Sequence, residues 1–199
     1  MNNIKQLMLV PLIVSSVLLY SFTSVAGEQV NETLMVKEAT TVAIENVSGK
    51  VNIIGWNKAS VHVEGELDDK AEKLVFEQVG STINISVELP NHGHWNSVGS
   101  QLTIRMPASL RVNFEGVSSN VELNNLTHSV IVKTVSGDIN AENLSQNIEL
   151  SSVSGNIKSK ALQGKINLSV VSGDIDDEGS TGRLQLQSVS GEIEAKTMA

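Results

Sequence analysis

From residue 117 onward, apolar and polar residues follow one frame that returns every eighteen residues without an insertion. The units begin at Val117, Val135, Val153, Val171 and Val189. Four residues later stand Val121, Ile139, Ile157, Ile175 and Ile193. Further apolar residues recur nine, thirteen and fifteen positions into the unit, with Ser180 as the exception at the ninth. A period this long indicates a stack of similar supersecondary units.

Each unit divides into two nine-residue halves, as in VSGNIKSKA followed by LQGKINLSV. Each half predicts a tight bend and a short strand whose apolar residues alternate at period two. Glycine tolerates the positive φ that such bends need, and it recurs at the bend as Gly137, Gly155, Gly173 and Gly191. One coil cannot bury its apolar face alone, whereas stacked coils pair about 4.8 Å apart. We therefore predict an all-β fold, a β-solenoid of stacked coils with two short strands per eighteen-residue repeat.

Stacking places like residues above one another, so Val135 is expected between Val117 and Val153, and Ile139 between Val121 and Ile157. The frame continues upstream, where Val112 and Phe114 fit the second half of a preceding coil. Near the N-terminus, residues 42–51 fit the frame again, and Trp56 stands nine residues after Val47. The next strand, Val61–Val63, arrives one residue late.

An irregular middle segment, about Glu66 to Gln101, breaks the period. The charged stretch Leu67–Phe76 is expected to form a helical turn or an irregular excursion. Thr82–Leu89 alternates as a strand, and Pro90–Ser100 is a polar loop. Because no long linker occurs, we predict a single domain over residues 27–199.

The first residues are typical of a secretory signal peptide. Lys5 precedes the apolar run Leu7–Phe22, and a small-x-small pattern predicts cleavage after Ala26. The alternative, an uncleaved membrane anchor, is less favoured because the run is shorter than the roughly 20 residues that span a bilayer. Residues 1–26 are thus interpreted as a signal peptide, which predicts a periplasmic, secreted or cell-surface protein with no stable membrane span after cleavage.

The composition excludes several classes of function. With 14 basic and 22 acidic residues and a net charge of -8, the chain lacks the basic surface that nucleic-acid binding needs. The absence of Cys excludes disulfides, thiol chemistry and Cys-based metal sites. No sequence motif indicates a cofactor.

The motifs IENVSGKVNIIGW, VHVEGELDD and LTIRMPASLRVNF, followed by serial VSGDI units, resemble the bacterial putative-adhesin family of β-strand-repeat proteins, a domain of unknown function. The resemblance covers about Glu28 to Ala199. It implies an extracytoplasmic β-solenoid and offers no catalytic residues. One departure is Ser119-Asn120 where the later units have Gly-Asp, Gly-Asn or Gly-Glu.

Polar positions of the repeat also form columns. One contains Ser118, Ser136, Ser154, Ser172 and Ser190, and its neighbour contains Asn120, Asp138, Asn156, Asp174 and Glu192. These columns allow a calcium-binding or carbohydrate-binding ladder, but turn chemistry explains them more simply. Lys165 and Arg183 stand where a continuous calcium row needs carboxylates.

Local clusters supply the weaker site hypotheses. Asp174, Asp176 and Asp177 are candidate ligands for one weakly bound ion. Asp138 and Asp174, two coils apart, are candidates for carboxylate-based glycan hydrolysis. In the polar loop, His92 and His94 are candidate metal ligands and Trp95 a candidate sugar platform, although a solvent-exposed loop with one ring packed against the coil is the favoured interpretation. His62 and His128 are interpreted as isolated surface residues.

The sequence therefore favours an exported, non-enzymatic β-solenoid that serves as a cell-envelope binding or adhesin-like module. Its partner is expected to be an envelope protein or glycan, and no nucleic acid. One alternative is a carbohydrate-binding or carbohydrate-active protein that uses the Asp ladder and the 90–100 loop. The other is a structural or stress-related periplasmic protein without a ligand of its own.

Overall fold

The computed structural model describes residues 27–90 and 98–196, and every regular element in them is a β strand. In chain order these are β1 (Gln29–Met35), β2 (Thr41–Trp56), β3 (Ser60–Glu66), β4 (Lys73–Val79), β5 (Thr82–Glu88), β6 (Ser100–Pro107) and β7 (Arg111–Leu126). There follow β8 (Val130–Ser136), β9 (Ile139–Ser154), β10 (Ile157–Lys160), β11 (Gln163–Ser172), β12 (Ile175–Glu178), β13 (Thr181–Ser190) and β14 (Ile193–Lys196). The predicted signal peptide lies outside the described residues.

The coils stack in parallel with the register that the eighteen-residue repeat predicts. Ile157 pairs with Ile139 on one side and with Ile175 on the other, and Ile175 pairs in turn with Ile193. In the second half of the coil, Ile166 lies between Ile148 and Leu184. The predicted β-solenoid with two strands per coil is confirmed.

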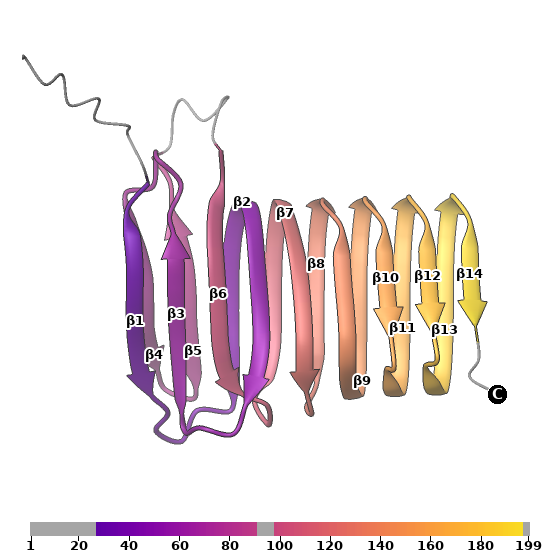
Figure 1. Cartoon of the computed structure of the whole chain (residues 1–199), viewed down its shortest axis with the longest axis horizontal. Helices are drawn as coiled ribbons and strands as arrows, with labels where there is room; N and C mark the ends of the chain where they lie inside the picture. The colour runs from indigo at the N-terminus through magenta and orange to yellow at the C-terminus, as the bar shows by residue number, and fades with distance from the viewer. Residues whose placement is uncertain (1–26, 91–97, 197–199) are drawn as a thin grey trace, which may run out of the picture.

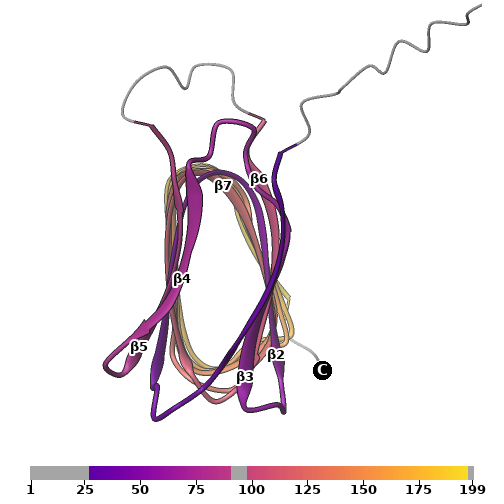
Figure 2. The same ribbon diagram turned by 90° about the vertical axis from the view of Figure 1, so that its left-hand side faces the viewer.

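The strands form one continuous 14-stranded sheet that folds into a flattened tube with two faces (Figures 1 and 2). We call face A the run β4–β5–β2–β7–β8–β9–β11–β13. Face B is the run β1–β3–β6–β2–β7–β9–β10–β12–β14. The long strands β2, β7 and β9 each bend around an edge of the tube and contribute one half to each face.

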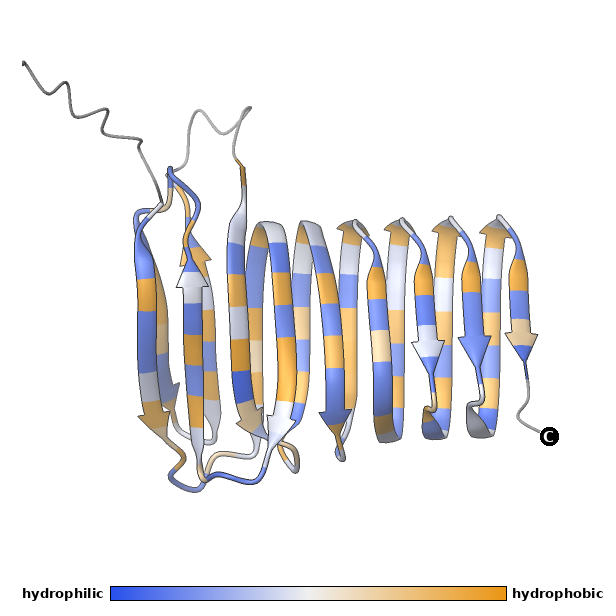
Figure 3. Ribbon diagram, in the orientation of Figure 1, coloured by the Kyte–Doolittle hydropathy of each residue, from blue (hydrophilic) through white to orange (hydrophobic). Residues whose placement is uncertain are grey.

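The core is a narrow apolar layer between the two faces. Inward positions carry Val, Ile and Leu, and side chains such as Ile139, Ile157 and Leu168 are completely buried. Outward positions are mostly polar, as the alternating bands of Figure 3 show. Burial of these aliphatic side chains, at about 25 cal/mol per Å² of apolar surface, is the main stabilising contribution in a chain that has no disulfide.

The N-terminal part reaches the same architecture by a different route. Strand β2 lies between β6 and β7 and pairs in parallel with both, although residues 57–110 separate β2 from β7 in sequence. The coil predicted over residues 42–51 is therefore real, but its neighbours come from elsewhere in the chain. Val112 and Phe114 are buried in the adjoining coil, as predicted.

The irregular middle segment contains more strand than the sequence indicated. The expected helical turn or irregular excursion over Leu67–Phe76 is wrong from residue 73 onward, because Lys73–Val79 forms β4 and pairs antiparallel with β5. The strand predicted over Thr82–Leu89 is confirmed as β5. The late strand at Val61–Val63 belongs to β3, which pairs antiparallel with β1 and β6 and so stands outside the coil repeat.

The bend at the VSG motif explains why glycine recurs there. Gly137 has a φ of +145°, and a Cβ atom on it would lie 2.2 Å from the carbonyl oxygen of Ser119. In the coil that lacks this glycine, the buried Ser119 hydroxyl donates to the Asn46 carbonyl oxygen (2.8 Å) and accepts from the Asn46 side-chain amide (3.1 Å). A side-chain bond to the preceding coil thus stabilises the bend at which Ser replaces the repeated Gly.

Candidate functional site

The Asn/Asp column of the repeat holds neighbouring coils together. The Asn120 side-chain oxygen accepts the backbone N–H of Asp138 at 2.9 Å, and Asp138 accepts that of Asn156 at 2.8 Å. Asn156 and Asp174 continue the series, ending at the backbone N–H of Glu192. One oxygen of each side chain is therefore occupied by the next coil, which is the turn chemistry favoured from the sequence.

The acidic cluster proposed as an ion site is divided by the strand alternation. Asp176 faces outward on face B, whereas Asp177 faces inward and is almost completely buried. The Asp177 carboxylate accepts hydrogen bonds from the hydroxyls of Ser159 and Ser180. Asp174 lies at the bend and contacts Glu192. Across residues 27–90 and 98–196, no three His, Cys, Asp or Glu side chains form a group suited to a metal ion.

The loop candidates His92, His94 and Trp95 lie outside the described residues. Asp138 and Asp174 lie in one column, two coils apart, and each uses a carboxylate oxygen to accept a backbone N–H of the following coil. The structure therefore does not bring the three aspartates of the ion-site hypothesis together, and it places the glycan-hydrolysis pair in the Asn/Asp column.

A continuous apolar row runs along the outside of the tube at the VSG bend. It contains the first residue of every unit, and we call it the valine ridge: Val47, Val117, Val135, Val153, Val171 and Val189. All six side chains are exposed, from 42% at Val47 to 73% at Val189. The ridge follows the upper edge of the coils in Figure 1, where apolar bands recur in Figure 3. The stacked valines predicted from the repeat therefore lie on the surface.

The ridge is continuous despite the interruption in sequence. The serines that follow the valines stack in one column, with Ser48 beside Ser118 and Ser118 beside Ser136. This register places Val47 next to Val117, because β2 packs directly on β7. A depression of about 270 Å³ lies at this end of the ridge, and its lining includes Val47, Val117 and the acidic residues Glu45 and Glu115.

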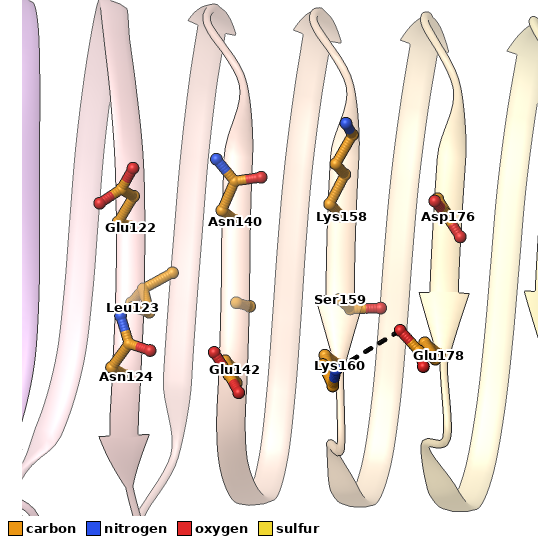
Figure 4. A pocket seen from close by; sticks show the side chains of 11 residues that line it. Glu122, Leu123, Asn124, Asn140, Glu142, Lys158, Ser159, Lys160, Asp176 and Glu178 are labelled. Carbon is orange, nitrogen blue, oxygen red and sulfur yellow. Dashed lines mark ion pairs between the residues drawn. The ribbon is translucent and has the colours of Figure 1, made fainter. Parts of the chain in front are cut away.

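Face B carries a polar trough on the outer surface of the regular coils. It measures about 400 Å³ and lies over β7, β9, β10 and β12 (Figure 4). Its outward side chains form rows of alternating charge in which Glu142 precedes Lys160, and Lys160 pairs with Glu178 at 3.6 Å. Exposed pairs of this kind contribute little to stability, and opposite charges on the adjacent strands β10 and β12 partly offset each other in the trough.

A second polar group was missed by the sequence analysis, which treated His62 as isolated. His62 contacts Thr33 Oγ1 (2.8 Å) and Glu64 Oε2 (3.2 Å), and Arg105 pairs with Glu64. The Arg105 guanidinium, followed by His62, holds the pKa of Glu64 below its usual value. The Trp56 ring stacks on His62 with the ring centroids 6.4 Å apart.

The two antiparallel pairings of β3 assemble this group. They place Thr33 and Arg105 on either side of His62, and the period-two alternation puts Glu64 on the same side of β3. Lys58 Nζ lies 4.7 Å from the centroid of the Trp56 ring, and the indole N–H donates to the Ser60 carbonyl oxygen (2.8 Å). Lys58 and His62 both contact the Trp56 ring, so the side chains of this group contact one another.

Comparison with known proteins gives a family and several distant folds. A family model described as Toastrack DUF4097 matches residues 39–198. A putative cell adhesion protein from Clostridium sporogenes is 12% identical, with 86% of this chain and 100% of that chain covered at a TM-score of 0.43. A putative adhesin from Bacteroides fragilis is 17% identical, with coverages of 84% and 97% and a TM-score of 0.43. No curated protein matches the sequence.

Proposed function

The chain belongs to the Toastrack DUF4097 family, a domain of unknown function, and we propose that it is an exported, non-enzymatic binding module of the cell envelope. In this adhesin-like role the valine ridge holds an elongated envelope protein or glycan. The observation that carries the proposal is the unbroken row of six exposed valines, the first residues of successive coils. The predicted signal peptide supports export to the periplasm or cell surface.

The free energy gained by covering the exposed valines favours an elongated partner. Full burial of a valine side chain contributes about 1.5–3 kcal/mol, so a half-exposed valine gains roughly 1 kcal/mol when it is covered. Association itself costs about 4–15 kcal/mol in lost freedom and ordering. One or two valines cannot offset that cost, whereas the whole row, together with polar contacts beside it, can. A partner that lies along the axis of the tube contacts every coil at once.

Other parts of the surface support the alternatives less well. The carbohydrate-binding or carbohydrate-active alternative used the Asp ladder and the 90–100 loop, and the Asn/Asp column uses side-chain oxygens in bonds between coils. The Trp56 ring, a possible sugar platform, is stacked on His62 and approached by Lys58.

Within the described ranges, no helix is long and apolar enough to cross a membrane.

The test is a capture experiment on purified protein from expression of the full 199-residue chain. The protein is immobilised and exposed to detergent-solubilised envelope and, separately, to isolated cell-wall glycan. The ridge variant carries Val135→Thr, Val153→Thr and Val171→Thr, because threonine keeps the β-branched shape that suits a strand while adding a hydroxyl. The control carries Met35→Thr and Val79→Thr, which change two exposed apolar residues away from the ridge.

We expect one protein or glycan to bind the wild type and the control and to be lost from the ridge variant, with all three melting alike. Retention by the ridge variant overturns the assignment to the ridge. Retention on glycan that depends on Asp138 or Asp174 instead favours the carbohydrate-binding alternative. No retained component in either arm favours a structural role without a ligand.

A further inference from the structure

Strand β4 lies in the interior of the sequence but forms an edge of the sheet. Among the described residues, β4 pairs only with β5. In Figure 2 the β4–β5 hairpin splays away from the outline of the tube, and no other strand runs along its outer side. The free edge of a strand is a template for pairing with another strand.

The backbone groups that point to this free edge belong to Leu74, Phe76 and Gln78. Val79 and Thr82 flank the two-residue turn of the hairpin, and the residues that flank such a turn exchange hydrogen bonds with each other. Hydrogen-bonded pairs alternate along two antiparallel strands. The residues between those pairs on β4 therefore direct their N–H and C=O groups away from β5.

The apolar residues on the inner side of β4 are incompletely covered. Leu74 and Phe76 pack against the core but are only partly buried. Val87 and Ile85, which lie opposite them on β5, are 6% and 1% exposed. The difference arises because β5 has a neighbouring strand on each side, whereas β4 has one on a single side within the described ranges. A further strand beside β4 would bury more of both side chains, which is favourable.

The sequence of β4 is complementary to itself in the antiparallel direction. In KLVFE, Lys73 and Glu77 stand at equal distances before and after Val75, and Leu74 and Phe76 stand between them. An antiparallel pair of two β4 strands centred on Val75 therefore places Lys73 of each copy opposite Glu77 of the other. Opposite charges at directly opposed positions stabilise a strand pair. The same register joins the outward backbone groups of Leu74 and Phe76.

Other registers of β4 lack this complementarity. With the centre moved to Phe76, Lys73 lies opposite Val79, and with the centre at Glu77 two carboxylates lie opposite each other. Lys73 pairs with Glu88 on β5 at 3.3 Å, whereas Glu77 makes no ion pair with any described residue. The register centred on Val75 is thus the one that gives Glu77 a basic partner.

We propose that two copies of this chain join by antiparallel pairing of their β4 strands around a twofold axis at Val75. Each copy contributes the same strand, so the contact closes on itself. The sheet then continues from face A of one copy into face A of the other. Strand β1, the edge of face B at the same end, has Glu32 as its one charged residue and offers no opposite charge for such a pair. The pairing is independent of the role assigned to the valine ridge.

The first test reverses the two charges. The molar mass of protein from expression of the full chain is measured by light scattering across a dilution series, and we expect two copies that fall to one on dilution. Lys73→Glu and Glu77→Lys each place like charges opposite each other at two symmetry-related contacts, so each should weaken the pairing by about tenfold or more. A mixture of the two variants restores opposite charges at both contacts and should pair as the wild type does.

The matched control is Lys165→Glu on β11. It reverses an exposed lysine that lies far from β4 along the sheet, and it should leave the pairing unchanged. All of these substitutions change exposed side chains, so the variants should melt like the wild type. A loss of pairing can then be assigned to the contact.

The second test locates the twofold axis, using the absence of native cysteine. In the proposed pair the two Val75 residues lie opposite each other without mutual hydrogen bonds, an arrangement with Cα atoms about 4.5 Å apart, which a disulfide can bridge. Val75→Cys should therefore give a disulfide-linked dimer under mild oxidation. Met35→Cys, at a more exposed residue of β1, should stay a single chain.

Four results would overturn the proposal. They are a wild type that stays a single copy at every concentration, pairing that survives both single charge reversals, a mixture of the two reversal variants that fails to pair, and a disulfide that forms equally well at residues 35 and 75.

Discussion

Residues 117–196 and residues 27–116 form the same tube by two routes. In the first region each coil packs on the next coil in sequence, so every register can be counted from the repeat. In the second region β2 packs between β6 and β7. Residues 57–110 form β3 to β6 on one side of β2 before the chain continues as β7 on its other side. The comparison shows that strands adjacent in the stack are adjacent in sequence only where the repeat is uninterrupted. In the interrupted region, strands of matching shape and apolar pattern pair although they are far apart in the chain.

The largest expected effect comes from placing a charge inside the regular region. Ile157→Asp buries an unpaired carboxylate at a fully buried position between Ile139 and Ile175 and should lower the free energy of unfolding by more than about 4 kcal/mol. Lys158→Asp puts the same group on the outer side of the same strand, opposite Asp176, and should lower it by no more than about 1 kcal/mol. Urea unfolding measures both, and similar values for the two would contradict the inward assignment.

Truncation of one isoleucine in each region tests whether the core of the interrupted region is as well packed as that of the regular coils. Ile53→Ala on β2 and Ile166→Ala on β11 remove side chains that are 0% and 1% exposed. Each should cost about 2–5 kcal/mol in a single cooperative transition. If Ile53→Ala costs far less, or melts β2 separately, then the N-terminal part is not continuous with the solenoid.

The bend at the VSG motif is the next point of comparison, because the coil that adjoins the interrupted region has Ser119 where the later coils have glycine. Gly137→Ala introduces a Cβ atom against the Ser119 carbonyl oxygen at a φ that disfavours alanine, so it should cost about 1–3 kcal/mol. Ser119→Ala removes the hydroxyl bonded to Asn46 and should cost about 1–3 kcal/mol, since a buried polar group loses its partner. A neutral result for Ser119→Ala, measured by thermal melting, would show that the Asn46 contact does not maintain that bend.

A smaller effect is expected from the Asn/Asp column. Asn156→Ala removes the acceptor for the backbone N–H of Asp174 on an exposed edge and should cost about 0.5–1.5 kcal/mol. Asn140→Ala, on the outer side of β9 in the trough, serves as the control. Equal melting temperatures for the two variants would mean that the hydrogen bonds of the Asn/Asp column do not add to the stability of the fold.

The smallest effect concerns pH and the Glu64 group of the interrupted region. The pKa of Glu64 is lowered in the folded state, mainly by Arg105 and then by His62. A lowered folded pKa stabilises the fold above the unfolded pKa, and this contribution is lost as the pH falls through the folded pKa. The stability difference between wild type and Glu64→Gln should therefore be present at neutral pH and vanish in acid. A difference that grows in acid would contradict the assigned direction.

The repeat made much of the fold predictable because its information is local. Register, bend positions and inward isoleucines followed from counting, whereas the placement of β2 depends on pairings across residues 57–110. The side on which the valines lie was available but unused: Leu150 and Ser152 point inward on β9, so alternation puts Val153 outside. The group around His62 could not be predicted, because Thr33 and Arg105 lie beside His62 only when β3 pairs with β1 and β6.

The central claim is that the valine ridge is the surface that holds an envelope partner. The most direct measurement is site-specific photo-crosslinking in living cells, with a benzophenone amino acid at Val153 or, as a control, at Val79. The claim predicts one crosslinked species of defined mass from position 153 that is absent from position 79. Crosslinks from neither position, or the same products from both, would contradict it.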